Sequence, residues 1–169
     1  MRRAVIVLAA GVMLAVVPSA GASARPPTRE FVPLPAQIVL DDVCPSFSIV
    51  ADILTNKVFA TTFTDASGDP VRVITTGALK VRLTNPENDE SAVRNISGPG
   101  TTTFNADGST TLVARGTWFF FFFPGQLSLG SEGSSIVHTG TLTLVTHPDG
   151  TQTIVSKSGR TEDLCATLS

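Results

Sequence analysis

Few side chains in this sequence are of the types that perform acid–base or nucleophilic chemistry. The chain of 169 residues has two histidines and no tyrosine, and it contains no Gly-x-Ser-x-Gly, His-Glu-x-x-His or phosphate-loop spacing. His138 shares strand parity with Ile136 and Leu142, which predicts an interior position and a structural role rather than that of a general base. His147 falls in a predicted turn. We therefore predict no catalytic residue, no cofactor and no metal site.

The two cysteines, Cys44 and Cys165, are the residues with the clearest covalent chemistry. They lie near opposite ends of the chain, and in an exported protein such a pair meets an oxidising environment in which disulfides persist. We predict a Cys44–Cys165 disulfide, which would stabilise the fold by at most roughly 4 to 5 kcal/mol in the chain-entropy model. The alternative is a lone reactive thiol with a distant partner.

The aromatic segment 118–123 (WFFFFF) is apolar on both faces of the strand that we predict for it. Residues of alternate parity along a strand point to opposite sides. One set is expected to face inward, where it fills the interior or, with His138, lines a pocket for an apolar ligand: Trp118, Phe120 and Phe122. The other set is expected to face outward as an interaction face: Phe119, Phe121 and Phe123.

Three outward phenylalanines make a patch that should not contact water, so we expect something to cover it. The first alternative is the Pro-rich arm at 25–36, whose apolar residues Phe31, Val32 and Leu34 have no other evident role. A homodimer or another protein partner is the second alternative. Contact with lipid or the cell envelope is the third.

The elements that must position these residues are strands. After residue 36 the chain consists of apolar and β-branched runs separated by Gly, Pro, Asn and Asp, with no extended apolar period of 3.6 residues. The runs predict strands at 37–43, 47–64, 71–84, 91–97, 101–105, 109–123, 135–146 and 151–161. This all-β pattern of about eight strands favours an antiparallel up-and-down β-barrel, because closure removes exposed edges and the disulfide would join the first strand region to the last. A two-sheet β-sandwich is the alternative.

The first residues of the sequence suggest export. Residues 1–24 combine a basic start, an apolar stretch and small residues, which is the pattern of a signal peptide. We expect cleavage after Ala24, an extended arm at 25–36, and one domain at 37–169. No second long apolar run follows, so we expect a secreted protein with no transmembrane segment in the mature chain.

The charge of the mature chain argues against a nucleic-acid partner. Loss of Arg2 and Arg3 takes the formal charge from −2 to −4. The remaining cations are scattered along the sequence, whereas phosphate binding requires clustered cations.

Three segments resemble a family of small secreted actinobacterial proteins of unknown function. They are 95–111 (NISGPGTTTFNADGSTT), the Phe-rich strand that ends in Pro124-Gly125, and the tail 159–165 (GRTEDLC). The resemblance implies export and a β-rich domain, and it implies no catalytic or binding residue.

Together these observations lead us to expect a secreted, non-catalytic binding module for an apolar small molecule or for a protein or envelope partner. One alternative is a small barrel enzyme that resembles allene oxide cyclase. The other is a structural or interaction protein, which a homodimer could form, that uses the Phe119, Phe121 and Phe123 face.

Overall fold

The protein is all-β apart from one short helix at its end. The computed structural model describes residues 25–128 and 132–169, so the predicted signal peptide at 1–24 lies outside the described residues. The elements are β1 (Thr28–Phe31), β2 (Gln37–Leu40), β3 (Ile49–Thr64), β4 (Pro70–Thr84), β5 (Ser91–Asn95), β6 (Gly100–Phe104), β7 (Thr110–Phe122), β8 (Ser134–Thr146), β9 (Gln152–Asp163) and α1 (Leu164–Thr167). In the described part of the chain, no helix has the length and apolar character needed to cross a membrane.

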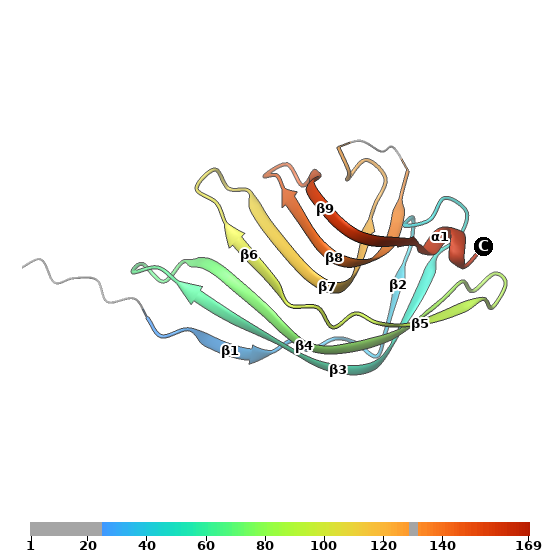
Figure 1. Cartoon of the computed structure of the whole chain (residues 1–169), viewed down its shortest axis with the longest axis horizontal. Coiled ribbons are helices and arrows are strands. Elements are labelled where there is room, and N and C mark those ends of the chain that lie inside the picture. Colours follow the sequence, from blue (N-terminus) through green and yellow to red (C-terminus); the bar gives the residue numbers. More distant parts are fainter. Residues whose placement is uncertain (1–24, 129–131) are drawn as a thin grey trace, which may run out of the picture.

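All nine strands belong to one antiparallel sheet (Figure 1). The main path runs β1-β3-β4-β6-β7-β8-β9. Two long strands each pair with two short strands along the same edge. β2 pairs with the first half of β3 and β1 with its second half, while β6 pairs with the first half of β4 and β5 with its second half. We call β2, β3, β4 and β5 the floor of the molecule, since the later strands lie over their concave side.

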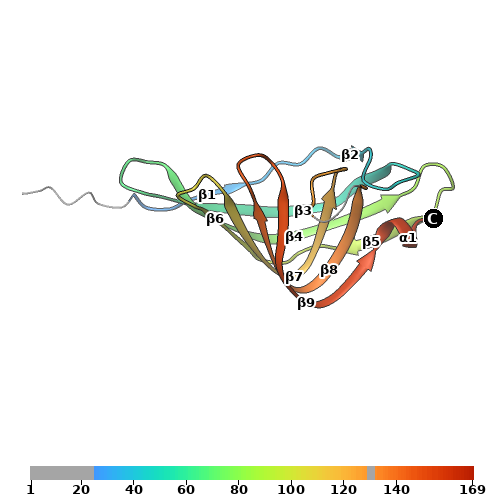
Figure 2. The same ribbon diagram turned by 90° about the horizontal axis from the view of Figure 1, so that it is seen from above.

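A row of glycines bends the last three strands sharply. Gly116, Gly140 and Gly159 pair with one another across β7, β8 and β9. All three have positive φ angles, of 78°, 145° and 115°, in a region that residues with a Cβ atom rarely adopt. A Cβ atom on Gly140 would lie 2.0 Å from the backbone oxygen of Ser158. Figures 1 and 2 show the resulting turn in the course of β7, β8 and β9.

This bend places the second half of β7 and the first half of β8, which pair with each other, inside the molecule as a middle layer. One face of that layer packs on the floor in a core cluster whose buried members include Ile49, Ala51, Val81, Leu83 and Val137. The other face packs on the first half of β7 and the second half of β8 in a second cluster of Ala114, Phe120, Phe122, Leu142 and Leu144. Strands buried on both faces read as continuous apolar runs rather than alternating ones, which accounts for the aromatic segment 118–123.

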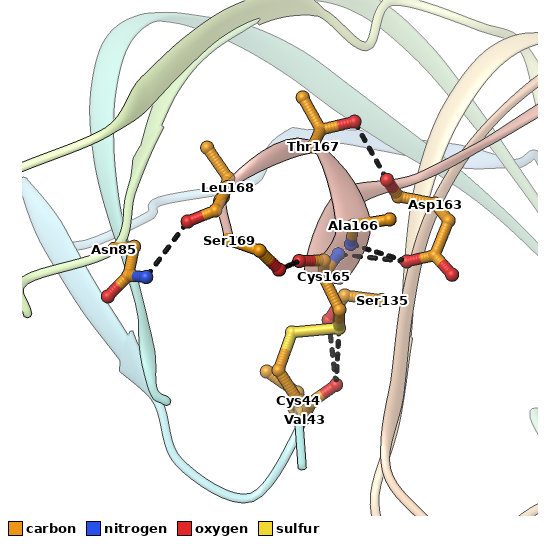
Figure 3. The surroundings of a disulfide bond; sticks show 10 residues. All are labelled: Val43, Cys44, Asn85, Ser135, Asp163, Cys165, Ala166, Thr167, Leu168 and Ser169. Carbon is orange, nitrogen blue, oxygen red and sulfur yellow. Dashed lines mark hydrogen bonds between the residues drawn. A yellow bond between two sulfur atoms is a disulfide. The ribbon is translucent and has the colours of Figure 1, made fainter. Parts of the chain in front are cut away.

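A disulfide closes one end of the folded sheet (Figure 3). Cys44 follows β2, Cys165 lies in α1 after β9, and their Cα atoms are 5.5 Å apart. Hydrogen bonds reinforce the junction, because the Ser135 hydroxyl donates to the Val43 carbonyl at 3.3 Å and the Asn85 amide donates to the Leu168 carbonyl at 2.8 Å. The predicted Cys44–Cys165 disulfide is therefore confirmed.

The predicted all-β antiparallel architecture is confirmed, but a closed barrel is not. Within residues 25–128 and 132–169 no ladder of backbone hydrogen bonds connects β9 to β1 or β2, so the sheet stays open. Closure is made by side chains and the disulfide, at one end. The folded-over sheet is compatible with the alternative sandwich, since two stretches of one sheet face each other. The predicted arm at 25–36 supplies a ninth strand, β1, at the edge of β3.

Candidate functional site: an apolar cleft between β7 and the floor

The aromatic strand β7 presents its two sets of side chains to two different interiors. Phe122 is 1% exposed and packs in the second cluster. Phe119 belongs to the opposite set and packs against the floor cluster. The alternation expected from the sequence is present. We expected Phe119 to face solvent, and this expectation is wrong, because the bend at Gly116 turns this part of the strand into the molecule. Phe121 and Phe123 remain partly exposed, at 39% and 42%.

Between the Phe119 face of β7 and the floor lies a cleft of about 240 Å³. The floor side is formed by aliphatic residues of β2, β3 and β4: Ile38, Leu40, Ala51, Ile53, Val58, Leu79 and Val81. Trp118, Phe119 and Phe121 form the opposite wall. The polar side chain that faces the cleft is that of Thr75, while Thr76 pairs with the outward-facing Phe59 and points to the other side of the sheet. A cavity with such walls attracts apolar molecules and offers one hydroxyl for orientation.

Small residues make room for the cleft and for the indole at its end. Gly77 lines the cleft at a φ of 129°, and a Cβ atom there would lie 2.0 Å from the Lys57 oxygen. The Trp118 ring covers two further glycines: a Cβ on Gly98 would lie 2.4 Å from Nε1, and one on Gly100 would lie 2.5 Å from Cζ2. The indole N–H donates to the Arg115 carbonyl at 3.2 Å. Its polar atom is thus satisfied locally, and the ring offers apolar surface.

A second cavity of about 270 Å³ lies on the other side of β7. Phe120 and Phe122 line it together with Leu112 from the first half of β7 and Leu144 from the second half of β8. Trp118, Phe119 and Phe121 line both cavities. Of the side chains that the sequence assigned to a pocket, the structure therefore places Trp118, Phe120 and Phe122 around one cavity. It also brings Phe119 and Phe121, assigned to an outer face, to the first.

The arm contributes one side chain to the cleft. Leu34 lies in its lining, and the backbone N–H of Val32 donates to the Val58 carbonyl at 2.9 Å. Phe31 is placed elsewhere: its ring meets Phe59 edge-on at 5.8 Å on the outer side of β3. The arm therefore contacts the cleft without covering Phe121 and Phe123.

His138 has the structural position that its parity predicts. It is 1% exposed and lies on the face of β8 that also carries Ile136. Its Nε2 lies 3.1 Å from the Ser158 carbonyl, which can only accept, so Nε2 carries the proton. Its Nδ1 then accepts from the Thr161 hydroxyl at 3.0 Å. Both ring nitrogens are engaged, and His138 is outside the residues that line the two cavities.

The remaining polar groups do not assemble into a metal centre within the described residues. His147 lies in the exposed turn between β8 and β9, where its Nε2 is 3.0 Å from the Thr153 hydroxyl. The pKa of Asp149 in the same turn is lowered, chiefly by the hydrogen bond from the Thr151 hydroxyl. This turn is organised by its own side chains, as Asp-containing turns commonly are.

An ion pair between Arg94 and Glu162 is a feature that our sequence reasoning missed. Arg94 Nε lies 2.9 Å and Nη2 2.5 Å from the two Glu162 oxygens, so the pair is bidentate. The hydrogen bond from Arg94 lowers the pKa of Glu162, and the carboxylate raises that of Arg94. The sequence held one signal for it: Arg94 has the same strand parity as Ala92, so a cation is expected on the inward face of β5, where it needs a partner. Its partner is on β9, which is not a neighbour of β5 in the sheet.

Comparison of the chain with protein-family models, with curated proteins and with solved structures finds no match. The resemblance to small secreted actinobacterial proteins stays a prediction. The function is therefore inferred from the geometry of the cleft.

Proposed function

We propose that this protein is a non-catalytic binding module that holds an apolar small molecule in the cleft between β7 and the floor. The observation that carries the proposal is the cleft itself: about 240 Å³ with aliphatic and aromatic walls and the hydroxyl of Thr75. An apolar cavity of about 150 Å³ is enough to bind benzene. The cleft therefore suits a molecule somewhat larger than a single aromatic ring.

The composition of the cleft also favours binding over catalysis. An enzyme of the allene-oxide-cyclase-like type would need an acid, a base or an oriented polar group close to the reacting atoms. Thr75 is the one polar side chain among the described residues that points into the cleft. Hydroxyls of this kind orient a ligand, and they do not supply a proton donor or acceptor poised near neutral pH.

We further infer that the protein works outside the cytoplasm. The predicted signal peptide at 1–24 supports export, and the Cys44–Cys165 disulfide is of the kind that persists in oxidising compartments. The exposed fractions of Phe121 and Phe123 favour one second candidate, a protein-binding role for these two rings, which meet at 5.8 Å.

Trp118 provides a direct test, because it is the one tryptophan of a chain without tyrosine and it lines the cleft. Titration of the chain with a series from toluene to n-butylbenzene should give a saturable change in tryptophan emission. The affinity should increase with chain length until the cleft is filled, since each buried methylene contributes about 0.8 kcal/mol. The proposal would be contradicted if none of these ligands changed the tryptophan emission.

A pair of matched variants distinguishes the cleft from other apolar surface. Val58→Phe fills the cleft from β3 and should weaken n-butylbenzene binding by at least about tenfold, an effect of roughly 1.4 kcal/mol. Val71→Phe adds the same ring at an exposed position of β4 and should leave the affinity unchanged. If both variants bind alike, the ligand lies elsewhere. Native mass spectrometry then tests the second candidate, for which a ligand-free dimer is the expected species.

A further inference from the structure

Cations that are scattered in the sequence gather on the outer face of β1, β3 and β4. Their orientation follows from their neighbours. Val81 and Leu83 are buried in the floor cluster, so Lys80 and Arg82 of the same strand point to the opposite, solvent side. Val58 lines the cleft, so Lys57 and Phe59 likewise point outward. In Figure 1 this outer side lies below β3 and β4, away from β7, β8 and β9.

Aromatic rings are interleaved with these cations. The Arg29 guanidinium lies over the Phe59 ring at 4.6 Å, and that of Arg72 lies over the Phe63 ring at 4.2 Å. Phe31, next to Arg29 on the edge strand β1, is 49% exposed. We call this surface the cationic face and define it by Arg29, Lys57, Arg72, Lys80 and Arg82 with the rings of Phe31, Phe59 and Phe63.

The cationic face has the opposite charge to the chain as a whole. The formal charge of the protein is −2. Among the residues of β1, β3 and β4, the one carboxylate that points to this side is Asp52, which lies between the cleft residues Ala51 and Ile53 and accepts a hydrogen bond from Gln37 at 2.8 Å. Glu30 has the opposite parity to Arg29. A molecule with such a separation of charge orients its cationic side toward an anionic surface.

We propose that the cationic face docks on the surface of a bilayer that contains anionic phospholipid. Clustered Lys and Arg side chains are attracted to the negative surface potential of such a bilayer. Phenylalanine rings and the aliphatic stems of Arg and Lys bury their apolar parts at the headgroup level while the charged ends stay hydrated. The half-exposed Phe31, at the outer edge of the sheet, is the ring that enters the interface.

The arrangement of the rings favours a bilayer over a single-stranded nucleic acid. Sheets that bind single strands offer free aromatic faces on which bases stack. Here the faces of Phe59 and Phe63 are occupied by Arg29 and Arg72 of the same chain. Their charge remains available for phosphate groups in a headgroup layer, where no stacking is required.

Co-sedimentation with lipid vesicles tests the proposal. The processed chain, residues 25–169, is mixed with vesicles of phosphatidylcholine containing 30% phosphatidylglycerol and with vesicles of phosphatidylcholine alone, at about 0.1 M salt where charges are screened beyond about 10 Å. Binding is expected to the anionic vesicles and to decrease as salt increases. Failure to bind anionic vesicles, or equal binding to both kinds, overturns the proposal, as does preferential binding of an oligothymidylate.

A matched pair of variants assigns the binding to this face. The variant R72Q/K80Q/R82Q should lower the partition coefficient on anionic vesicles by roughly a hundredfold, because each cation near the surface contributes about a fivefold effect. The control R115Q/K157Q/R160Q removes the same charge from exposed positions of β7 and β9 and should lower it by less than about threefold. Equal losses in the two variants would show a response to net charge alone and would overturn the proposal. Phe31→Ser should reduce the fraction that stays bound in high salt, and unchanged salt resistance would refute the role of that ring.

Discussion

At the scale of single residues, polar side-chain contacts hold strands of this protein together. Polar side chains are matched to specific partners: His138 to Thr161 and Ser158, and Arg94 to Glu162. The ion pair joins strands on two sides of the folded sheet, and about 30% of each side chain remains exposed. Solvent therefore screens the pair, and its contribution should be that of a partly exposed salt bridge.

The pair makes stability depend on pH in a defined direction. The pKa of Glu162 is lowered from its ordinary value of 4.5, chiefly by the hydrogen bond from Arg94. A carboxyl whose folded-state pKa is lower contributes stability above its unfolded-state value, and the contribution is lost as the pH falls from about 4.5 through the folded-state pKa. We expect Glu162→Gln to lower the unfolding free energy at pH 7 by roughly 0.5 to 1 kcal/mol.

Urea denaturation at a series of pH values measures this effect. The difference between the wild type and Glu162→Gln should shrink as the pH is lowered below about 4.5, since the wild-type carboxyl then becomes neutral as well. Glu90→Gln, an equal charge change in the exposed turn between β4 and β5, is the control. If the unfolding free energies of the two variants show the same pH dependence, the ion pair does not contribute to stability.

At the scale of elements, β7 packs against both core clusters of the molecule. Its second half lies between two core clusters: Phe119 packs on the floor cluster, Phe122 packs in the second cluster, and Phe121 stays partly exposed. The glycine row makes this arrangement sterically accessible, because the three paired residues Gly116, Gly140 and Gly159 adopt positive φ together. A flat strand of the same composition would expose one set of rings.

Alanine substitutions along β7 test the middle-layer position. Phe122→Ala should cost about 3 to 5 kcal/mol, as for other buried phenylalanines. Phe119→Ala should also cost roughly 1 to 3 kcal/mol, because its ring packs on the floor cluster. Phe123→Ala, at a ring that is 42% exposed, should cost less than about 1 kcal/mol. Thermal or urea unfolding measures all three, and a Phe119→Ala effect as small as that of Phe123→Ala would contradict the middle-layer position.

At the scale of the whole molecule, the open sheet is held together at one end. The disulfide links positions 121 residues apart, and α1 carries Cys165 and is followed directly by the buried Leu168, whose carbonyl accepts from Asn85. Side-chain ties of this kind replace the backbone ladder that would close a barrel. β1 forms the other edge of the sheet in its main path, and among the described residues no backbone ladder joins it to β9 (Figure 1).

Removal of the disulfide should therefore loosen the closed end first. We expect Cys44→Ser/Cys165→Ser to lower the unfolding free energy by roughly 2 to 4 kcal/mol, since the unfolded chain loses its cross-link. Hydrogen exchange should increase most in α1 and in the adjacent end of β9. Asn85→Ala is the comparison, because it removes the hydrogen bond to Leu168 at the end of the same helix and the one that Asn85 Oδ1 accepts from the Glu87 N–H, and it should cost about 1 to 2 kcal/mol. Uniform exchange across the sheet would contradict a disulfide that acts at this junction.

The amino-acid sequence by itself determined the strands and the covalent link. Period-two patterns and Gly, Pro, Asn and Asp turns predicted 71–84 and 135–146, which the structure gives as β4 (Pro70–Thr84) and β8 (Ser134–Thr146). Both patterns are local, since each strand end is set by its own turn chemistry. The pairing of Cys44 with Cys165 also needed no geometry, because the chain holds two cysteines.

Tertiary structure alone decided what each face of a strand meets. Parity separated Phe119 from Phe120, but it could not show that β7 turns inward, because that depends on three glycines from different strands meeting in register. The cleft, the ion pair of Arg94 with Glu162, and the cationic face arise in the same way, from residues far apart in sequence. Alternation along a strand fixes only which side a residue takes, while the fold of the sheet determines whether that side meets solvent, a second layer or an apolar cleft.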